Sequence, residues 1–156
     1  MQTLPAVVDP PDHLSIHPRI ALYDSSSLKA LITAGRARAY FKHRYTLLDR
    51  GVTVDFFDPA GHRQSRLSAD SILIDDNSQH MMAAGNVAVH AANPPTLLQT
   101  SRLFWDKRSR QLYTPDSVTV ETPTEKIFAI GFESDERLQN YTFRNVRMVI
   151  QKQKEE

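Results

Sequence analysis

The chain has 156 residues, no cysteine and a formal net charge of +1. This length suits one domain with a sizeable core, and the absence of cysteine excludes a disulfide scaffold and a cysteine-ligated zinc site. The nearly balanced charge provides no basic stripe for a phosphate backbone, so a nucleic acid is a poor candidate partner. No apolar run reaches the ~18 residues that a membrane-spanning helix needs.

The two ends of the chain are predicted to lie outside the folded domain. Prolines at positions 5, 10, 11 and 18 interrupt the N-terminal segment, which also lacks the apolar core of a signal peptide. We expect a proline-rich linker or trimmed anchor region over 1–18, a folded domain over 19–151 and a charged tail over 152–156.

An internal repeat is the most informative feature of the sequence. The segment 74–87 resembles 105–118, and 134–146 repeats the pattern one residue shorter. Each segment passes through a polar, Asp-containing turn and an apolar stretch to a valine. The valines at 52, 87, 118 and 146 mark a period of about 30 residues, which is typical of an architecture that stacks one unit.

The repeating unit is predicted to consist of two strands and two turns. Stretches such as Val52–Phe56 and Val87–His90 alternate apolar and polar residues and are rich in β-branched side chains, which is the pattern of strands. The segment 26–40 is rich in Ala and Leu and is also compatible with a helix; we interpret it as strand because it falls in the repeat. Strands are expected near 19–24, 28–40, 45–57, 65–74, 81–90, 97–105, 111–121, 127–134 and 139–150.

Alternation along these strands predicts one apolar and one polar face. Two such sheets could close on each other as a sealed sandwich or leave a lined slot, and the sequence does not separate the two. Asp55, Arg66, Asp70, His90, Arg102, Glu121 and Arg147 are expected to face outward. The residues expected to face inward are Val52, Val54, Phe56, Leu67, Ala69, Val87, Val89, Leu98, Leu103, Leu112, Val118, Val120, Ile127, Tyr141, Val146 and Met148.

An ordered set of short motifs resembles one known family. The motifs are Leu67-Ser-Ala-Asp70, Ala84-Gly-Asn-Val-Ala-Val89, Leu103-Phe-Trp-Asp106, Leu112-Tyr-Thr114 and Gly131-Phe-Glu-Ser-Asp135, followed by Asn140-Tyr141 and Asn145-Val146. Together they resemble the LptC family of periplasmic lipopolysaccharide-export proteins over about residues 20–150. The resemblance implies an all-β fold: an open β-jellyroll, which is a folded-over antiparallel sheet, here built from repeats.

The resemblance also implies a function without catalysis. The chain would accept lipopolysaccharide from an inner-membrane ABC transporter and pass its acyl chains along an apolar groove to an LptA-like bridge protein. All the inward residues above except Leu112 and Tyr141 would line the groove. The chain would be periplasmic, tethered to the inner membrane by an N-terminal segment missing from this sequence. An LptA-like bridge subunit and a structural β-solenoid or adhesin fragment with a sealed core are the alternatives.

Members of the family assemble edge to edge, because an edge strand can accept a partner strand. By resemblance, the strand 20–24 would face the transporter and the strand 141–150 would dock the bridge protein. Self-association through the same edges is also possible. The expected edge residues are Ile20, Leu22, Tyr141, Phe143, Arg144, Arg147 and Ile150, with Arg144 and Arg147 either gatekeeper charges or ordinary solvated residues.

Catalytic and metal-binding patterns are missing from the sequence. The six histidines form no His-Glu-x-x-His pattern, and there is no Gly-x-Ser-x-Gly elbow or glycine-rich phosphate loop. The carboxylates at 75, 76, 133 and 135 fall at predicted turns, where Asp serves turn geometry. Trp105 could stack on a sugar, but a Trp at a strand end more often fills a core. We expect no enzyme activity, no cofactor and no metal.

Overall fold

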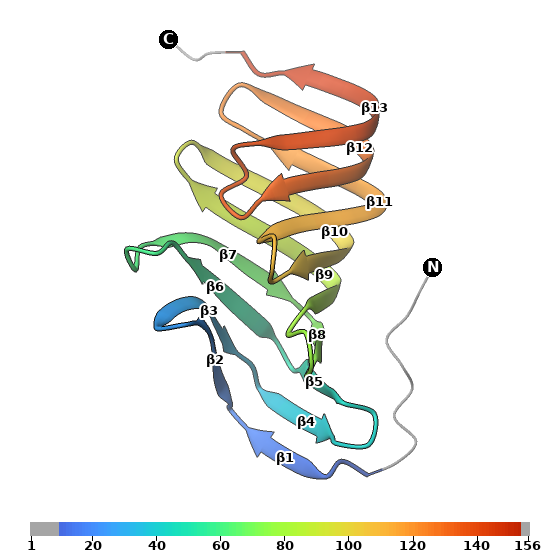
Figure 1. The fold of residues 1–156 in the computed structure, drawn as a ribbon. Coiled ribbons are helices and arrows are strands. Elements are labelled where there is room, and N and C mark those ends of the chain that lie inside the picture. Colours follow the sequence, from blue (N-terminus) through green and yellow to red (C-terminus); the bar gives the residue numbers. More distant parts are fainter. Residues whose placement is uncertain (1–9, 154–156) are drawn as a thin grey trace.

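Residues 10–153 are described by the computed structural model, and they form thirteen strands of one antiparallel sheet (Figure 1). Within this range there is no helix of the length and apolarity needed to cross a membrane. The strands are β1 His13–Ile16, β2 Arg19–Asp24, β3 Ser27–Thr33, β4 Arg36–Tyr40, β5 Tyr45–Asp49, β6 Val52–Phe57, β7 Arg63–Ala69, β8 Ser71–Asp75, β9 Met81–Ala92, β10 Pro95–Asp106, β11 Gln111–Glu121, β12 Glu125–Asp135 and β13 Tyr141–Gln151.

The predicted all-β fold is confirmed, but three of the expected strands, 28–40, 45–57 and 65–74, are each divided into two. The ambiguous segment 26–40 is strand, as expected, but it is divided into β3 and β4. The expected linker over 1–18 is wrong for its last part, because His13–Ile16 forms β1 and pairs with β4. The backbone of a short edge strand can pair even where prolines flank it. Residues 1–9 of the predicted linker and 154–156 of the predicted tail lie outside the described residues.

The sheet is folded over on itself into two arms. The long strand β9 pairs along one side with both β8, through its first half, and β7, through its second half. The first arm therefore contains β1, β4, β5 and β8, and the second arm contains β2, β3, β6 and β7. Strands β9 to β13 run through the bend and contribute one half to each arm, with a register shift in each of their four pairings.

Glycines permit the tight bend between the arms. Gly85 in β9 and Gly131 in β12 have φ values of +83° and +81°, a region that side chains with a Cβ rarely adopt. A Cβ on Gly85 would lie 2.5 Å from Oδ2 of Asp70, and one on Gly131 would lie 2.7 Å from Cβ of Arg144. At the bend the neighbouring chain segments thus lie so close to Gly85 and Gly131 that a larger residue at either position would clash.

The bend also explains the sequence repeat. One period corresponds to one strand that crosses the bend and its return strand. Val52, Val87 and Val118 are each placed just after the bend, where the chain enters the second arm, and they are at most 3% exposed. Val146 occupies the same place in β13, but it is 49% exposed because no further strand covers it.

A single apolar core fills the space between the arms. The rings of Phe56 in the second arm and Trp105 in the first arm lie 5.4 Å apart. Trp105 is 2% exposed, so its predicted role as a core-filling residue is confirmed.

Candidate functional site

The inner faces of the two arms hold most residues of the predicted groove. These residues come from β6, β7 and β9 to β12 and are at most 7% exposed. They are Val52, Val54, Phe56, Leu67, Ala69, Val87, Val89, Leu98, Leu103, Val118, Val120 and Ile127. Leu112, also expected to face inward, is fully buried. The strand alternation therefore identified the inner surface correctly along most of the chain.

The last strand departs from the predicted pattern. Met148 was expected to face inward, but it lies opposite Phe128 and is 50% exposed. A register irregularity between Phe128 and Ala129 of β12 shifts the alternation of β13 by one residue. Val149, opposite the buried Ile127, takes the inward position in place of Met148. Residues directly opposite each other in a sheet share a face, so Val146, opposite the buried Ala129, does face inward.

The interior is packed in this structure. Val54, Phe56, Val89, Leu98, Leu112 and Val120 have no exposed surface. A surface hollow of about 540 Å³ instead lies outside the core, near the bend, where outward-facing residues such as Gln99, Phe128 and Arg147 line it. The arms are therefore closed over their apolar faces in this structure.

Both ends of the folded sheet are edges with exposed apolar side chains. Leu14, Ile16 and Tyr23 are more than half exposed at the end formed by β1 and β2. Val146, Met148, Val149 and Ile150 are 44–50% exposed on β13 at the other end. Within the described residues no strand pairs with the outer side of β2 or β13. An edge strand of this kind can pair with a strand of another protein and so continue the sheet.

The predicted edge residues occupy different positions. Ile20, Tyr141 and Phe143 are partly buried against the core, whereas Leu22 is only 4% exposed and belongs to the core itself. Ile150 is exposed opposite Lys126. The exposed Arg144 passes over Gly131 at the bend, and the exposed Arg147 borders the outer hollow.

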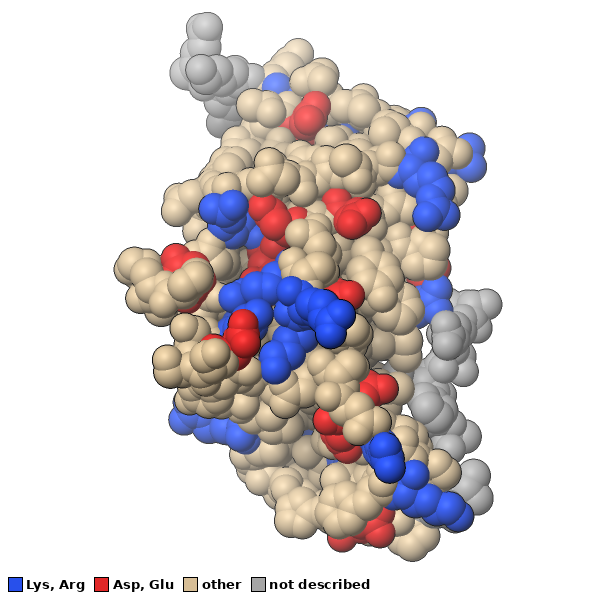
Figure 2. Space-filling model, viewed as in Figure 1, with Lys and Arg blue, Asp and Glu red and all other residues tan. Residues whose placement is uncertain are grey.

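Opposite the bend, hairpin turns of the two arms meet along a side of the fold that we call the mouth. The first arm contributes the turns 41–44, 76–80, 107–110 and 136–140, and the second arm contributes 25–26, 58–62, 93–94 and 122–124. Charged side chains of both signs gather around the turn between β10 and β11 (Figure 2). Among them are Lys107, Arg108 and Arg110.

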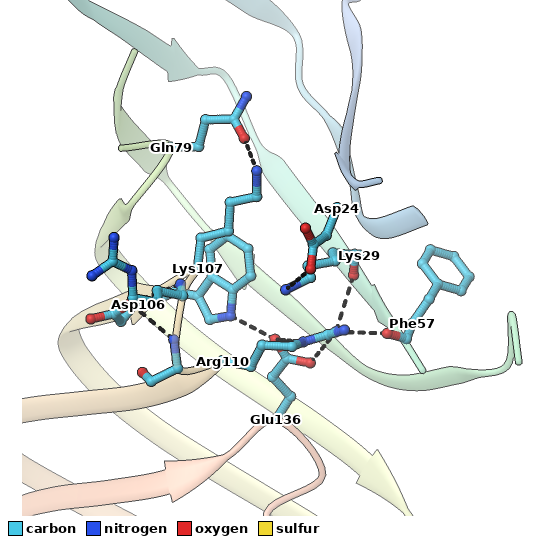
Figure 3. A network of polar contacts seen from close by, with 11 residues as sticks. Asp24, Lys29, Phe57, Gln79, Asp106, Lys107, Arg110 and Glu136 are labelled. Carbon is cyan, nitrogen blue, oxygen red and sulfur yellow. Dashed lines mark hydrogen bonds and ion pairs between the residues drawn. The ribbon is translucent and has the colours of Figure 1, made fainter. Parts of the chain in front are cut away.

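A buried ion pair lies at the centre of the mouth (Figure 3). Nη2 of Arg110 is 2.5 Å from Oε1 of Glu136, and Nε1 of Trp105 donates to Oε2 of Glu136 at 2.6 Å. Glu136 is 5% exposed, and burial raises the pKa of its carboxyl although the bonds from Arg110 and Trp105 oppose the rise. The sequence offered no motif for this pair, because its two members are 26 residues apart in different turns.

The Asp residues of the repeat serve the turns, as predicted. Asp75 accepts backbone N–H bonds from Asn77 and Ser78, which lower the pKa of its carboxyl. Asp106 likewise accepts backbone N–H bonds from Ser109 and Arg108, which lower the pKa of its carboxyl. In residues 10–153 no three His, Asp or Glu side chains come together as a candidate metal site.

Comparison with known proteins agrees with this architecture. The family model "Lipopolysaccharide-assembly, LptC-related" matches residues 6–151. The fold is similar to the crystal structure of LptH from Pseudomonas aeruginosa, the LptA-homologous periplasmic component of a lipopolysaccharide transport device. The TM-score is 0.59 at 11% sequence identity, over 81% of this chain and 95% of that one. A search of curated proteins finds no match.

The fold and its inner surface define an open β-jellyroll, a folded antiparallel sheet with an apolar interior and two free ends. The chain belongs to the LptC-related family of lipopolysaccharide-assembly proteins.

Proposed function

We propose that this chain is a periplasmic, non-catalytic carrier that holds the acyl chains of lipopolysaccharide between its two arms. It accepts the lipid from an inner-membrane ABC transporter and passes it to an LptA-like bridge protein. In the cell, an N-terminal segment tethers it to the inner membrane. The observation that supports this function best is the continuous apolar inner surface, which reaches the free end at Val146 and Val149.

The energetics of acyl chains favour such a carrier. Each methylene left in water costs ~0.8 kcal/mol, so one acyl chain of about a dozen carbons costs roughly 10 kcal/mol. Several chains per molecule would prevent free passage through an aqueous compartment. Apolar contact between the arms removes this cost without any chemical step. The same contact can continue into a neighbouring jellyroll if the sheets join edge to edge.

The two edges provide places for both proposed partners. The strands β1 and β2 would face the transporter, and β13 would receive the bridge protein. Tyr141 and Phe143 in the first arm face inward beside Phe132, and their ring centroids lie 5.4 Å apart. With Val146 and Val149 they form the open end of the interior, where a joined jellyroll would extend the apolar surface.

Binding of acylated and de-acylated lipopolysaccharide tests the proposal. The purified chain is expected to co-elute with intact lipopolysaccharide on a sizing column. It should not bind the same molecule after chemical removal of its acyl chains, because only the acyl chains match the apolar interior. Mass spectrometry of the protein fraction identifies the bound lipid. Equal binding of both forms would indicate recognition of the sugar and contradict the proposal.

The packed interior favours a second candidate, a structural module with a sealed core. The core residues Val54, Phe56, Val89 and Leu98 have no exposed surface and leave no room for an acyl chain without movement of the arms. A module of this kind would bind neither form of lipopolysaccharide. The experiment above therefore separates the two candidates.

A further inference from the structure

The mouth is the side on which the closed arms would have to part if acyl chains are to reach the core. On the opposite side the strands β9 to β13 run continuously from one arm into the other, so the bend cannot open without breaking the sheet. At the mouth the arms are joined by side-chain contacts between turns. Those contacts, together with the apolar contacts of the core, resist separation of the arms.

Arg110 makes the central contact across the mouth. It lies in the turn between β10 and β11 of the first arm, and its Nη2 donates to the backbone carbonyl of Phe57 at 2.6 Å and to that of Lys29 at 3.4 Å (Figure 3). Both carbonyls belong to the second arm, at the end of β6 and near the start of β3. One guanidinium thus holds two strands of the opposite arm.

Glu136 fixes the direction of this guanidinium. Its carboxylate accepts hydrogen bonds from Nε and Nη2 of Arg110. These two bonds hold the planar guanidinium on one side while it contacts the second arm on the other. Trp105 anchors the carboxylate to the core from beneath. The group is poorly hydrated, because the side chains of Arg110 and Glu136 are 23% and 6% exposed. Loss of one partner in such a pair leaves a buried charge uncompensated.

Surface hollows lie between turns of the two arms on either side of the Arg110–Glu136 pair. A hollow of about 360 Å³ is lined by Pro59 of the second arm and Ser109 of the first arm, among others. Another, of about 620 Å³, is lined by Lys29 of the second arm and Lys107 of the first arm, among others. Beside Arg110 the turns are therefore separated by these hollows. A second contact across the mouth lies at another pair of turns, where Nε2 of Gln139 donates to the backbone carbonyl of Asn93 at 2.7 Å.

We propose that Arg110, oriented by Glu136, is a lock that keeps the arms closed, and that release of this lock admits acyl chains to the core. This inference rests on the proposed function for its lipid step. The opening of the arms itself is independent of lipid and is measurable without it.

Spin labels across the mouth measure the opening. The chain has no cysteine, so Pro59→Cys and Ser109→Cys, both exposed on opposite lips of the mouth, place two labels unambiguously. Arg110→Met in this background is expected to lengthen and broaden the distance distribution, and to raise the rate of uptake of fluorescent lipopolysaccharide by about tenfold. Arg108→Met, an exposed arginine of the same turn, is the matched control and should change neither.

An unchanged distance distribution in a folded Arg110→Met protein would overturn the lock. If Arg110→Met does not fold, the protein with Pro59→Cys and Ser109→Cys but with Arg110 retained is tested instead. A short bis-maleimide bridge between its two cysteines should slow lipopolysaccharide uptake by about tenfold or more. Unaltered uptake by the bridged protein would overturn the lock as well. Failure of the unbridged protein to bind lipopolysaccharide at all would contradict the proposed function instead, while the spin-label distances would still decide the lock.

Discussion

A Trp105→Ala variant is expected to lose about 4 kcal/mol of the free energy of unfolding, because truncation of a buried Trp leaves a large cavity. Trp105 is 2% exposed and packs against Phe56 of the opposite arm. Its removal also takes the indole N–H bond away from the buried Glu136 carboxylate. Urea denaturation followed by far-ultraviolet circular dichroism measures the loss.

Tyr113→Ala is the matched control for this prediction. Tyr113 is also an aromatic residue of the first arm, but it is 42% exposed and stacks on Phe104 on the outer face. We expect it to cost about 1 kcal/mol or less. Similar losses for the two variants would show that the contact between the arms does not dominate stability.

Paired substitution of Val146→Lys and Val149→Lys is expected to weaken docking of an LptA-like bridge protein by about a hundredfold, with the fold retained. Both valines face inward on the last strand and are 49% and 44% exposed, so a partner that continues the sheet would bury them. Two lysines would place charges in this joint. Surface plasmon resonance with the bridge protein from the same genome measures the change, and circular dichroism confirms folding.

A control adds the same charges to the other face of β13. Thr142 and Asn145 lie opposite Glu133 and Ile130 and point outward. The pair Thr142→Lys and Asn145→Lys should leave docking largely intact. If it weakens docking as much as the inward pair, the apolar end of the interior does not form the joint.

The sequence predicted the strands well because their alternation is local. Within each half of β9 to β12 the inner face follows from every second residue, and the repeat of valines marks where the chain enters the second arm. The fold class and the family also followed from short motifs in order. The prediction for Met148 was wrong because one irregularity in the pairing of β12 with β13 exchanges the inward and outward faces of β13 beyond it. Nothing in the residues themselves signals that shift.

The mouth could not be predicted from the sequence for a different reason. Arg110 contacts the carbonyl of Lys29, 81 positions away, and a backbone acceptor has no sequence signature. Glu136 and Arg137 look like ordinary charged turn residues, yet Glu136 is 5% exposed. The bend left a weak signal in Gly85 and Gly131, which lie near the middle of β9 and β12. The positive φ values and the close approach of Asp70 and Arg144, which the structure reveals, explain why glycine is needed there.

Photo-crosslinking from two adjacent leucines tests most directly whether lipid lies between the arms. Leu98 is fully buried opposite Val89 and Val120, whereas its neighbour Leu97 faces outward opposite His90 and Glu121. Photo-leucine has nearly the shape of leucine and can replace either residue with little effect on packing. With intact lipopolysaccharide, we expect crosslinks from position 98 and none from position 97. No crosslink from position 98 in the folded protein, or equal crosslinks from both positions, would contradict a lipid-holding interior.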